Sequence, residues 1–332
     1  MRYGIYMFLI SALMAPLALF AQGVPGISDP LTLTLFPENP RPNETVTARI
    51  QSFSIDLDAA LITWTVNGKE VSSGVGQKSV SVDSGRLGSL SRIDVSVTTP
   101  NASVSESIVI RPADVSLVWE ADTYVPPFYR GKALHSYNGS FRVTAVPEFV
   151  GDNGRAIDPK DLIYTWKKNG AVVGEASGYG KNQFVSTQTS YLREGEDITV
   201  EVSSPRESIV ASRSVTIQPV VPKIVFYEKS GLYGARYQTA VGNRFSLTND
   251  EVTFVAEPFF FSVTGKNDPV LLSTWKLNGR ELVDFSGDME ITLRRDNNTA
   301  GRSEIRLVLQ STSRVLQGAS GLTLITFDEK NN

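Results

Sequence analysis

The sequence contains no cysteine and only one histidine, His135, among its 332 residues. Without thiols the chain forms no disulfide bond and offers neither a thiolate nucleophile nor cysteine ligands for zinc. No glycine-rich phosphate loop and no Gly-x-Ser-x-Gly elbow is present either. We therefore expect a protein that is not an enzyme and needs no cofactor, with His135 in a solvated loop and domains held together by apolar burial alone.

A strong charge of either sign is also missing. The formal net charge is −3, so bulk electrostatics does not favour nucleic acid or an anionic membrane as a partner. Amphipathic helical periodicity is lacking along the chain. Hydrophobic residues make up 41% of the chain and charged residues 20%, which favours packed cores over disorder.

Long apolar runs are confined to the N-terminus. Arg2 precedes an apolar run over residues 5–20 that ends in Leu19-Phe20-Ala21 before Gln22. This pattern predicts a signal peptide over residues 1–21, followed by a flexible leader over 22–30. A bilayer span needs about 20 residues, so cleavage is favoured over an uncleaved anchor. We expect an exported protein, extracellular, at the cell surface or periplasmic, with no transmembrane span in the mature chain.

One short pattern, Thr-Trp-x-x-Asn-Gly, occurs three times, at residues 63–68, 165–170 and 274–279. Asn-Gly is a strong indication of a tight β-hairpin, because a type I′ turn needs positive φ at both central residues. The large apolar side chain before each turn can anchor a sandwich core. These core candidates are Trp64, Trp166 and Trp275, spaced 102 and 109 positions apart, which is about one immunoglobulin domain.

Alternating apolar and polar residues predict further strands around each hairpin, and Pro112 and Pro219 separate a closing strand from the next opening one. We predict an all-β protein of three tandem immunoglobulin-like β-sandwich domains, at residues 31–112, 113–219 and 220–327, with a tail at 328–332. The short linkers favour a semi-rigid stack, although free hinging remains an alternative.

The export signal, the three Thr-Trp-x-x-Asn-Gly hairpins and the proline-punctuated linkers resemble those of bacterial secreted and cell-surface proteins built from tandem Ig-like or PKD-like modules. The chain is similar to an uncharacterised group of such proteins over about residues 31–327. The resemblance implies the fold and no activity or site, because these modules serve as stalks, adhesins, sugar binders and assembly parts.

Two aromatic insertions, at residues 124–131 and 232–237, are the candidate contact surfaces. Each is broken by proline or glycine, unlike a strand inside a core, and their candidate ligand-contact residues are Tyr124, Phe128, Tyr129, Tyr233 and Tyr237. Exposed aromatic side chains bind sugars or partner proteins. The favoured alternative is that the insertions cover the linkers and stiffen the joints between domains, because they follow the boundaries. Tyr179, between two glycines, is a weaker solitary case.

An acidic loop at residues 151–161 contains the weak calcium candidates Asp152, Asp158 and Asp161. Calcium takes six to eight oxygen ligands, which such a loop can supply. However, the spacing matches no dedicated calcium motif, and Arg155 and Lys160 compete for the carboxylates. Turn formation by Asp and Asn explains the loop better, so we expect no metal.

These observations favour a non-catalytic exported structural or interaction protein, a semi-rigid stack of Ig-like modules at the cell surface or in an exported assembly. We expect a protein or glycan partner at the cell surface. The alternative is an adhesin-type binder of a glycan or protein ligand through the aromatic insertions of domains 2 and 3. An enzyme is the third possibility and the least favoured, because acid–base and nucleophile sets are missing.

Overall fold

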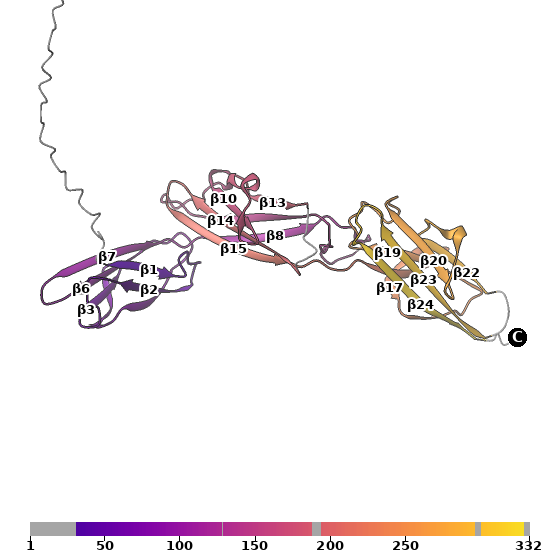
Figure 1. The fold of residues 1–332 in the computed structure, drawn as a ribbon, viewed down its shortest axis with the longest axis horizontal. Coiled ribbons are helices and arrows are strands. Elements are labelled where there is room, and N and C mark those ends of the chain that lie inside the picture. The colour runs from indigo at the N-terminus through magenta and orange to yellow at the C-terminus, as the bar shows by residue number, and fades with distance from the viewer. Residues whose placement is uncertain (1–30, 128, 188–193, 296–299, 329–332) are drawn as a thin grey trace, which may run out of the picture. The chain divides into compact units, whose positions relative to one another are not determined.

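The computed structural model describes residues 31–127, 129–187, 194–295 and 300–328. The predicted signal peptide, the leader, Phe128 and residues 329–332 of the tail lie outside the described residues. Within the described part the regular elements are strands, apart from short 3-10 turns (Figure 1). The all-β prediction is confirmed. No helix in this part of the chain reaches the length and apolar character that crossing a membrane requires.

Residues 32–110 contribute strands to two sheets. One sheet has the order β1-β2-β5, from β1 (Thr32–Phe36), β2 (Thr45–Gln51) and β5 (Ser79–Asp83). The other has the order β4-β3-β6-β7, from β3 (Leu61–Val66), β4 (Lys69–Val75), β6 (Ser91–Thr98) and β7 (Ser103–Ile110). Alternate residues of β3 are buried, and the indole Nε1 of the enclosed Trp64 donates to the Gln77 carbonyl at 2.8 Å.

Residues 114–217 repeat this arrangement. The order β13-β9-β8 joins β8 (Asp114–Ala121), β9 (Phe141–Glu148) and β13 (Gln183–Ser186). The order β11-β10-β14-β15 joins β10 (Ile163–Lys168), β11 (Ala171–Val172), β14 (Glu196–Ser204) and β15 (Ile209–Ile217), and β12 (Gly178–Tyr179) also pairs with β10. Short 3-10 turns are η1 (Pro159–Asp161) and η2 (Gly174–Ala176).

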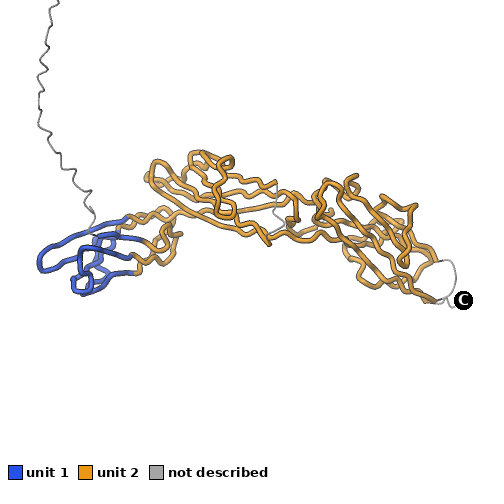
Figure 2. The backbone as a smooth tube through the Cα atoms, viewed as in Figure 1, with its two compact units in different colours: residues 1–34, 49–80, 93–108 blue, residues 35–48, 81–92, 109–332 orange. Residues whose placement is uncertain are grey.

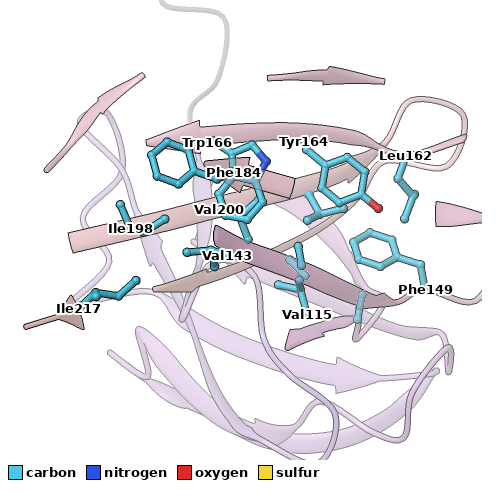
Figure 3. Close-up of a cluster of buried hydrophobic side chains, with 14 of the residues drawn as sticks. Val115, Val143, Phe149, Leu162, Tyr164, Trp166, Phe184, Ile198, Val200 and Ile217 are labelled. Carbon is cyan, nitrogen blue, oxygen red and sulfur yellow. The ribbon is translucent and has the colours of Figure 1, made fainter. Parts of the chain in front are cut away.

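The core of residues 113–217 lies around Trp166. Its ring is 5.7 Å from that of Phe184 between the centroids, and Figure 3 shows both among valine and isoleucine side chains of the two sheets. The indole Nε1 donates to the Lys181 carbonyl at 2.8 Å. Burial of this large ring therefore leaves no unpaired donor, which favours its place in the core.

Residues 223–327 contain the same sheets with two additions. The order β17-β16-β19-β22 joins β16 (Lys223–Ser230), β17 (Gly234–Val241), β19 (Glu251–Phe259) and β22 (Glu290–Arg294). The order β18-β24-β23-β20-β21 joins β18 (Arg244–Ser246), β20 (Leu271–Leu277), β21 (Arg280–Glu281), β23 (Gly301–Ser311) and β24 (Gly318–Phe327). The 3-10 turn η3 (Val283–Phe285) follows β21. The additions are β17 and β18, and β18 runs parallel to β24.

The strand order has one logic in all three stretches. When β12, β17 and β18 are left out of the count, the first, second and fifth strands of each stretch form one sheet, and the third, fourth, sixth and seventh form the other. This is the arrangement of immunoglobulin-like and fibronectin-like sandwiches. The Ig-like fold class is thereby confirmed from the chain's own topology. In each of the three Thr-Trp-x-x-Asn-Gly motifs both residues of the Asn-Gly pair have positive φ, for example 51° at Asn67 and 80° at Gly68. Trp64, Trp166 and Trp275 are all completely buried.

Contacts between Cα atoms divide the chain into two compact units (Figure 2). One comprises residues 1–34, 49–80 and 93–108, and the other comprises residues 35–48, 81–92 and 109–332. This division does not test the expected boundaries near residues 112 and 219, so the three-domain organisation stays a prediction.

Candidate functional site

The two aromatic insertions meet at one buried carboxylate, that of Glu257 in β19. The Tyr124 hydroxyl donates to Glu257 Oε2 at 2.9 Å, and the Tyr237 hydroxyl donates to Oε1 at 2.7 Å. Lys266 Nζ donates to Oε1 at 3.1 Å. The side chain of Glu257 is 0% exposed. A buried carboxylate is costly unless it is paired and hydrogen-bonded, and here two phenols and an ammonium group supply that compensation.

The alternation of β19 explains why Glu257 faces the insertions. Side chains of a strand point alternately to opposite faces, and Phe254 and Ala256 belong to the sandwich core. Glu257 and Phe259 therefore point to the other face, where Phe259 joins Tyr227 and Phe260 in a separate apolar cluster. Because residues 254–260 are all buried, both faces of this end of β19 are covered.

Burial, and then the hydrogen bond to Glu257, raises the pKa of the Tyr124 phenol well above its usual value. The same two causes raise the pKa of Tyr237. Burial, and then the charge of Glu257, also raises the pKa of Tyr227. Both phenols that donate to Glu257 consequently stay protonated throughout the physiological range.

Backbone hydrogen bonds connect the same two segments. The Tyr124 N–H donates to the Phe261 carbonyl at 2.7 Å, and the Phe260 N–H donates to the Tyr124 carbonyl at 2.8 Å. Phe260 has a φ of 66°, which is unfavourable for a bulky residue and persists where surrounding contacts impose it. The Ser136 hydroxyl also donates to the Phe260 carbonyl.

Two further contacts fasten the connection between β8 and β9 to residues after 219. The Val220 N–H donates to the His135 carbonyl at 2.7 Å. The buried Gln317 amide donates from Nε2 to the Tyr137 carbonyl at 2.9 Å and to Ser262 Oγ at 2.8 Å. We call the contacts of residues 124–127 and 129–137 with Val220, Tyr237, Glu257–Ser262 and Gln317 the joint.

Apolar packing accompanies these polar contacts in the joint. Val125, Leu134 and Val220 pack against the Phe259 and Phe260 cluster. The ring of Tyr129 meets that of Phe259 edge to face at 5.4 Å between centroids, a favourable aromatic geometry. Tyr129 nevertheless remains 38% exposed.

The candidate contact residues therefore fall into different environments. Tyr124, Tyr129 and Tyr237 lie in the joint, and their contacts are made within the chain. Tyr233 is 80% exposed at the turn between β16 and β17 and does not belong to this group. Phe128, the remaining candidate, lies outside the described residues.

The expectation that His135 is solvated is wrong. His135 is completely buried, and its ring lies edge to face against Phe141 at 4.9 Å between centroids. Burial lowers its pKa to about 4, partly offset by the charge of Glu196. The imidazole is consequently neutral at pH 7. Its neighbours Phe141 and Glu196 come from β9 and β14, which a local reading of Leu134-His135-Ser136 does not predict.

The acidic loop uses its carboxylates in turns and ion pairs. Asp158 Oδ1 accepts the Lys160 N–H at 3.1 Å, and Oδ2 lies 2.9 Å from Lys160 Nζ. These hydrogen bonds lower the pKa of Asp158. Asp152 forms an ion pair with Arg111, whereas Asp161 is exposed at the end of η1. Within the described residues, no group of three or more Asp, Glu, His or Cys side chains is arranged to hold a metal ion.

Sequence reasoning missed Glu257, Lys266 and Gln317. For Glu257 an indication was available, because it is the single charged residue in the mostly apolar run 252–261. A charged residue in such a run is rarely buried unless it is paired. Lys266 and Gln317 gave no local indication, since their partners are supplied by distant parts of the chain.

Comparison with known proteins identifies no relative by sequence. No protein-family model matches the chain, and no curated protein matches it. Among solved structures, the chain is similar to the three N-terminal domains of the bacteriophage RB49 highly immunogenic outer capsid protein. The identity is 13% and the TM-score is 0.27, and the match covers 91% of this chain and 100% of that chain.

Two other solved structures have comparable similarity. The central fibronectin-III array of RIM-binding protein has 12% identity, covers 91% of this chain and 96% of its own, and has a TM-score of 0.30. The second is Bacteroides ovatus SGBP-B of the mixed-linkage glucan utilization locus, in complex with a mixed-linkage heptasaccharide. It has 16% identity and a TM-score of 0.21, and the match covers 90% of this chain and 70% of that chain. At these scores the similarities carry no argument about function.

Proposed function

We propose that the chain is a non-catalytic exported structural or interaction protein in which tandem immunoglobulin-like modules hold or space a partner. The joint is the observation that carries this proposal. Three aromatic residues that could have formed a ligand platform, Tyr124, Tyr129 and Tyr237, are used for contacts within the chain. Residues 114–217 and 223–327 thereby act as one semi-rigid unit.

The composition of the joint supports a lasting connection. Interfaces between domains of one chain permit relative motion unless they are large and hydrophobic. This joint combines an apolar cluster with the fully buried Glu257, and separating it would expose both to water. Re-solvation would also break hydrogen bonds to a charged group, each contributing about 1.5–3 kcal/mol.

The state of the single histidine supports a non-catalytic role. An efficient general acid or base has a pKa near the working pH and reaches the substrate. His135 is buried, and burial lowers its pKa to about 4. Its place beside Phe141 explains the side chain as part of the packing under the joint.

A distance measurement between spin labels tests the proposed unit. Because the native chain has no cysteine, Ser212→Cys in β15 and Glu281→Cys in β21 would be the sole labelling sites. We expect a narrow distance distribution that broadens with Glu257→Ala. Glu251→Ala is the matched control, since this carboxylate of the same strand is exposed and pairs with Arg294. A broad distance distribution in the labelled chain that keeps Glu257 would contradict the proposal.

The signal-peptide pattern of residues 1–21 supports export of the chain. Cell fractionation tests this export. We expect the full chain in the periplasmic, surface or medium fraction, with a shortened N-terminus by mass spectrometry. Retention of the intact chain in the cytosol would contradict export. Replacing Leu9 and Ile10 by Arg should block it, because a signal peptide needs its apolar core.

One observation favours the adhesin-type alternative. Leu232 and Tyr233 are each 80% exposed at the turn between β16 and β17, where large apolar side chains contribute nothing to the core. Exposed apolar residues can mark interaction sites. Binding of a protein or glycan that is lost with Tyr233→Ala, while the joint stays intact by the label distances, would establish this alternative.

A further inference from the structure

A polar cavity lies at the end of the second stretch that is opposite the joint. Loops at residues 151–161 and 204–207 line it together with Tyr179, and its volume is about 410 Å³. Strand β8 connects the two ends, since Asp114 pairs with Glu148 just before the first loop and Ala121 precedes the joint. Its eight residues separate cavity and joint by roughly 25 Å at about 3.3 Å per residue.

Backbone hydrogen bonds form one wall of the cavity without any ligand. Val150 and Ala156 make an antiparallel bridge, and the Gly151 N–H donates to the Arg155 carbonyl at 2.9 Å. The Gly154 N–H closes the turn on the Gly151 carbonyl at 2.9 Å, with a φ of 71° at Gly154. The loop is therefore preorganised, which reduces the entropy lost when a ligand binds.

Side chains fasten the second loop to the first. Glu207 Oε2 accepts the Asp152 N–H at 2.9 Å and lies 3.0 Å from Arg111 Nη1. Arg111 also pairs with Asp152. This arrangement fixes the distance between the two loops across the cavity.

The aromatic ring at the cavity is exposed although its backbone is held in place. Tyr179 is 64% exposed in β12, where it pairs with Ile163. The following Gly180 donates its N–H to the Leu162 carbonyl at 2.9 Å, and a Cβ there would approach the Lys160 backbone to 3.3 Å. Close packing at Gly180 thus fixes the backbone from which Tyr179 lines the cavity.

The charges at the cavity indicate the chemistry of a ligand. Lys160 neutralises Asp158, and Arg111 serves both Asp152 and Glu207. Asp161 remains as an acceptor, and Arg155 and Arg206 form no ion pair within the described residues, so they remain as donors. Donors and an acceptor of opposite charge side by side suit a neutral group that both donates and accepts hydrogen bonds. Arg111, Arg155, Lys160 and Arg206 together balance Asp152, Asp158, Asp161 and Glu207, so the net charge around the cavity favours neither an anion nor a cation.

We propose that this cavity binds a neutral glycan, with the Tyr179 ring against the C–H face of one sugar residue. Asp161 accepts from sugar hydroxyls, and Arg155 and Arg206 donate to them. The volume falls in the range of about 300–1,000 Å³ that is typical of small-ligand sites, and Tyr179 supplies an aromatic surface among the polar side chains of the lining. The site goes beyond the proposed function, because a spacing module needs no ligand at this end.

Isothermal titration of the full chain with neutral cello-, xylo- and manno-oligosaccharides, and with an acidic oligogalacturonate, tests this site. We expect at least one neutral oligosaccharide to bind. Tyr179→Ala and Arg206→Ala should each weaken it at least tenfold, whereas Tyr179→Phe retains most of the affinity because the ring is kept. Phe53→Ala, at an exposed aromatic residue of the first stretch, should leave it unchanged.

Three results would overturn the inference: no neutral oligosaccharide binds, only the acidic one binds, or binding survives both Tyr179→Ala and Arg206→Ala. Melting temperatures of the variants establish that each remains folded. If Tyr179→Ala does not fold, the Arg206→Ala result decides. The label distances across the joint should be the same in all of these variants, so failure of the glycan site is distinguishable from failure of the proposed function.

Discussion

The hydroxyl of Tyr124 donates a 2.9 Å hydrogen bond to the carboxylate of Glu257, which lies 133 positions later in the chain. The acceptor is completely buried and also receives Tyr237 and Lys266. One carboxylate thus connects the segment after β8 with β17, β19 and the loop after β19. Loss of this acceptor should affect every element that reaches it.

Glu257→Ala should lower the free energy of unfolding by about 3–5 kcal/mol, because it leaves the Lys266 charge and two phenols without their acceptor. Glu251→Ala, which removes an exposed ion pair with Arg294, should cost at most about 1 kcal/mol. Urea denaturation of the full chain measures both. A loss below about 1 kcal/mol for Glu257→Ala would mean that the carboxylate is not the centre of the joint.

Tyr124→Phe and Tyr237→Phe should each cost about 1.5–3 kcal/mol, the contribution of a hydrogen bond to a charged group. Since both phenols share Glu257, the double variant should deviate from additivity by about 0.5 kcal/mol or more. A double-mutant cycle from urea denaturation measures this coupling. Tyr233→Phe is the control, because Tyr233 is exposed and should change stability little. Strict additivity of the two single variants would contradict a shared acceptor.

The local features of the fold could be predicted because neighbouring residues determine them. Asn67-Gly68, Asn169-Gly170 and Asn278-Gly279 all adopt the positive φ that a type I′ turn needs. Period-two alternation in β3 and β14 similarly follows from side chains of a strand pointing to opposite faces. These patterns predict strands and turns without knowledge of what packs on them.

The joint could not be predicted in this way, because its partners are distant in sequence. The sequence predicts only an aromatic insertion at residues 232–237, whereas residues 234–241 form β17 and bring Tyr237 to Glu257. Whether an aromatic residue is a ligand platform or an internal contact depends on what covers it. For Tyr124 the partner is Glu257 of β19, and for His135 it is Phe141 of β9.

Trp166→Ala should destabilise the chain by about 3–5 kcal/mol, as for large aromatic deletions in a core. The ring is completely buried against Phe184, and the substitution also leaves the Lys181 carbonyl without its indole donor. Val172→Ala, at an exposed position of the neighbouring strand β11, is the control and should cost less than about 0.5 kcal/mol. Thermal or urea denaturation followed by near-UV circular dichroism measures both. If Trp166→Ala and Val172→Ala lowered the free energy of unfolding by similarly small amounts, Trp166 would not be an anchor of the core.

Stability should fall as the pH is lowered from about 6.5 to about 4, with His135 as one identifiable source. Burial lowers the pKa of His135 to about 4 in the folded chain, whereas an unfolded histidine has a pKa of about 6.5. Between these values the unfolded state binds more protons, so the free energy of unfolding decreases as pH falls through this window. The contribution of His135 to the free energy of unfolding is fully present above pH 6.5.

Comparison with His135→Gln isolates this contribution, because the carboxylates that titrate in the same range are common to both chains. We expect urea denaturation at pH 4.5 and 7.5 to give a larger difference for the native chain than for His135→Gln. The variant should be less stable at pH 7.5, since glutamine does not reproduce the edge contact with Phe141. Equal pH differences in the two chains would mean that His135 gains its proton as easily when folded as when unfolded, which its complete burial makes unfavourable.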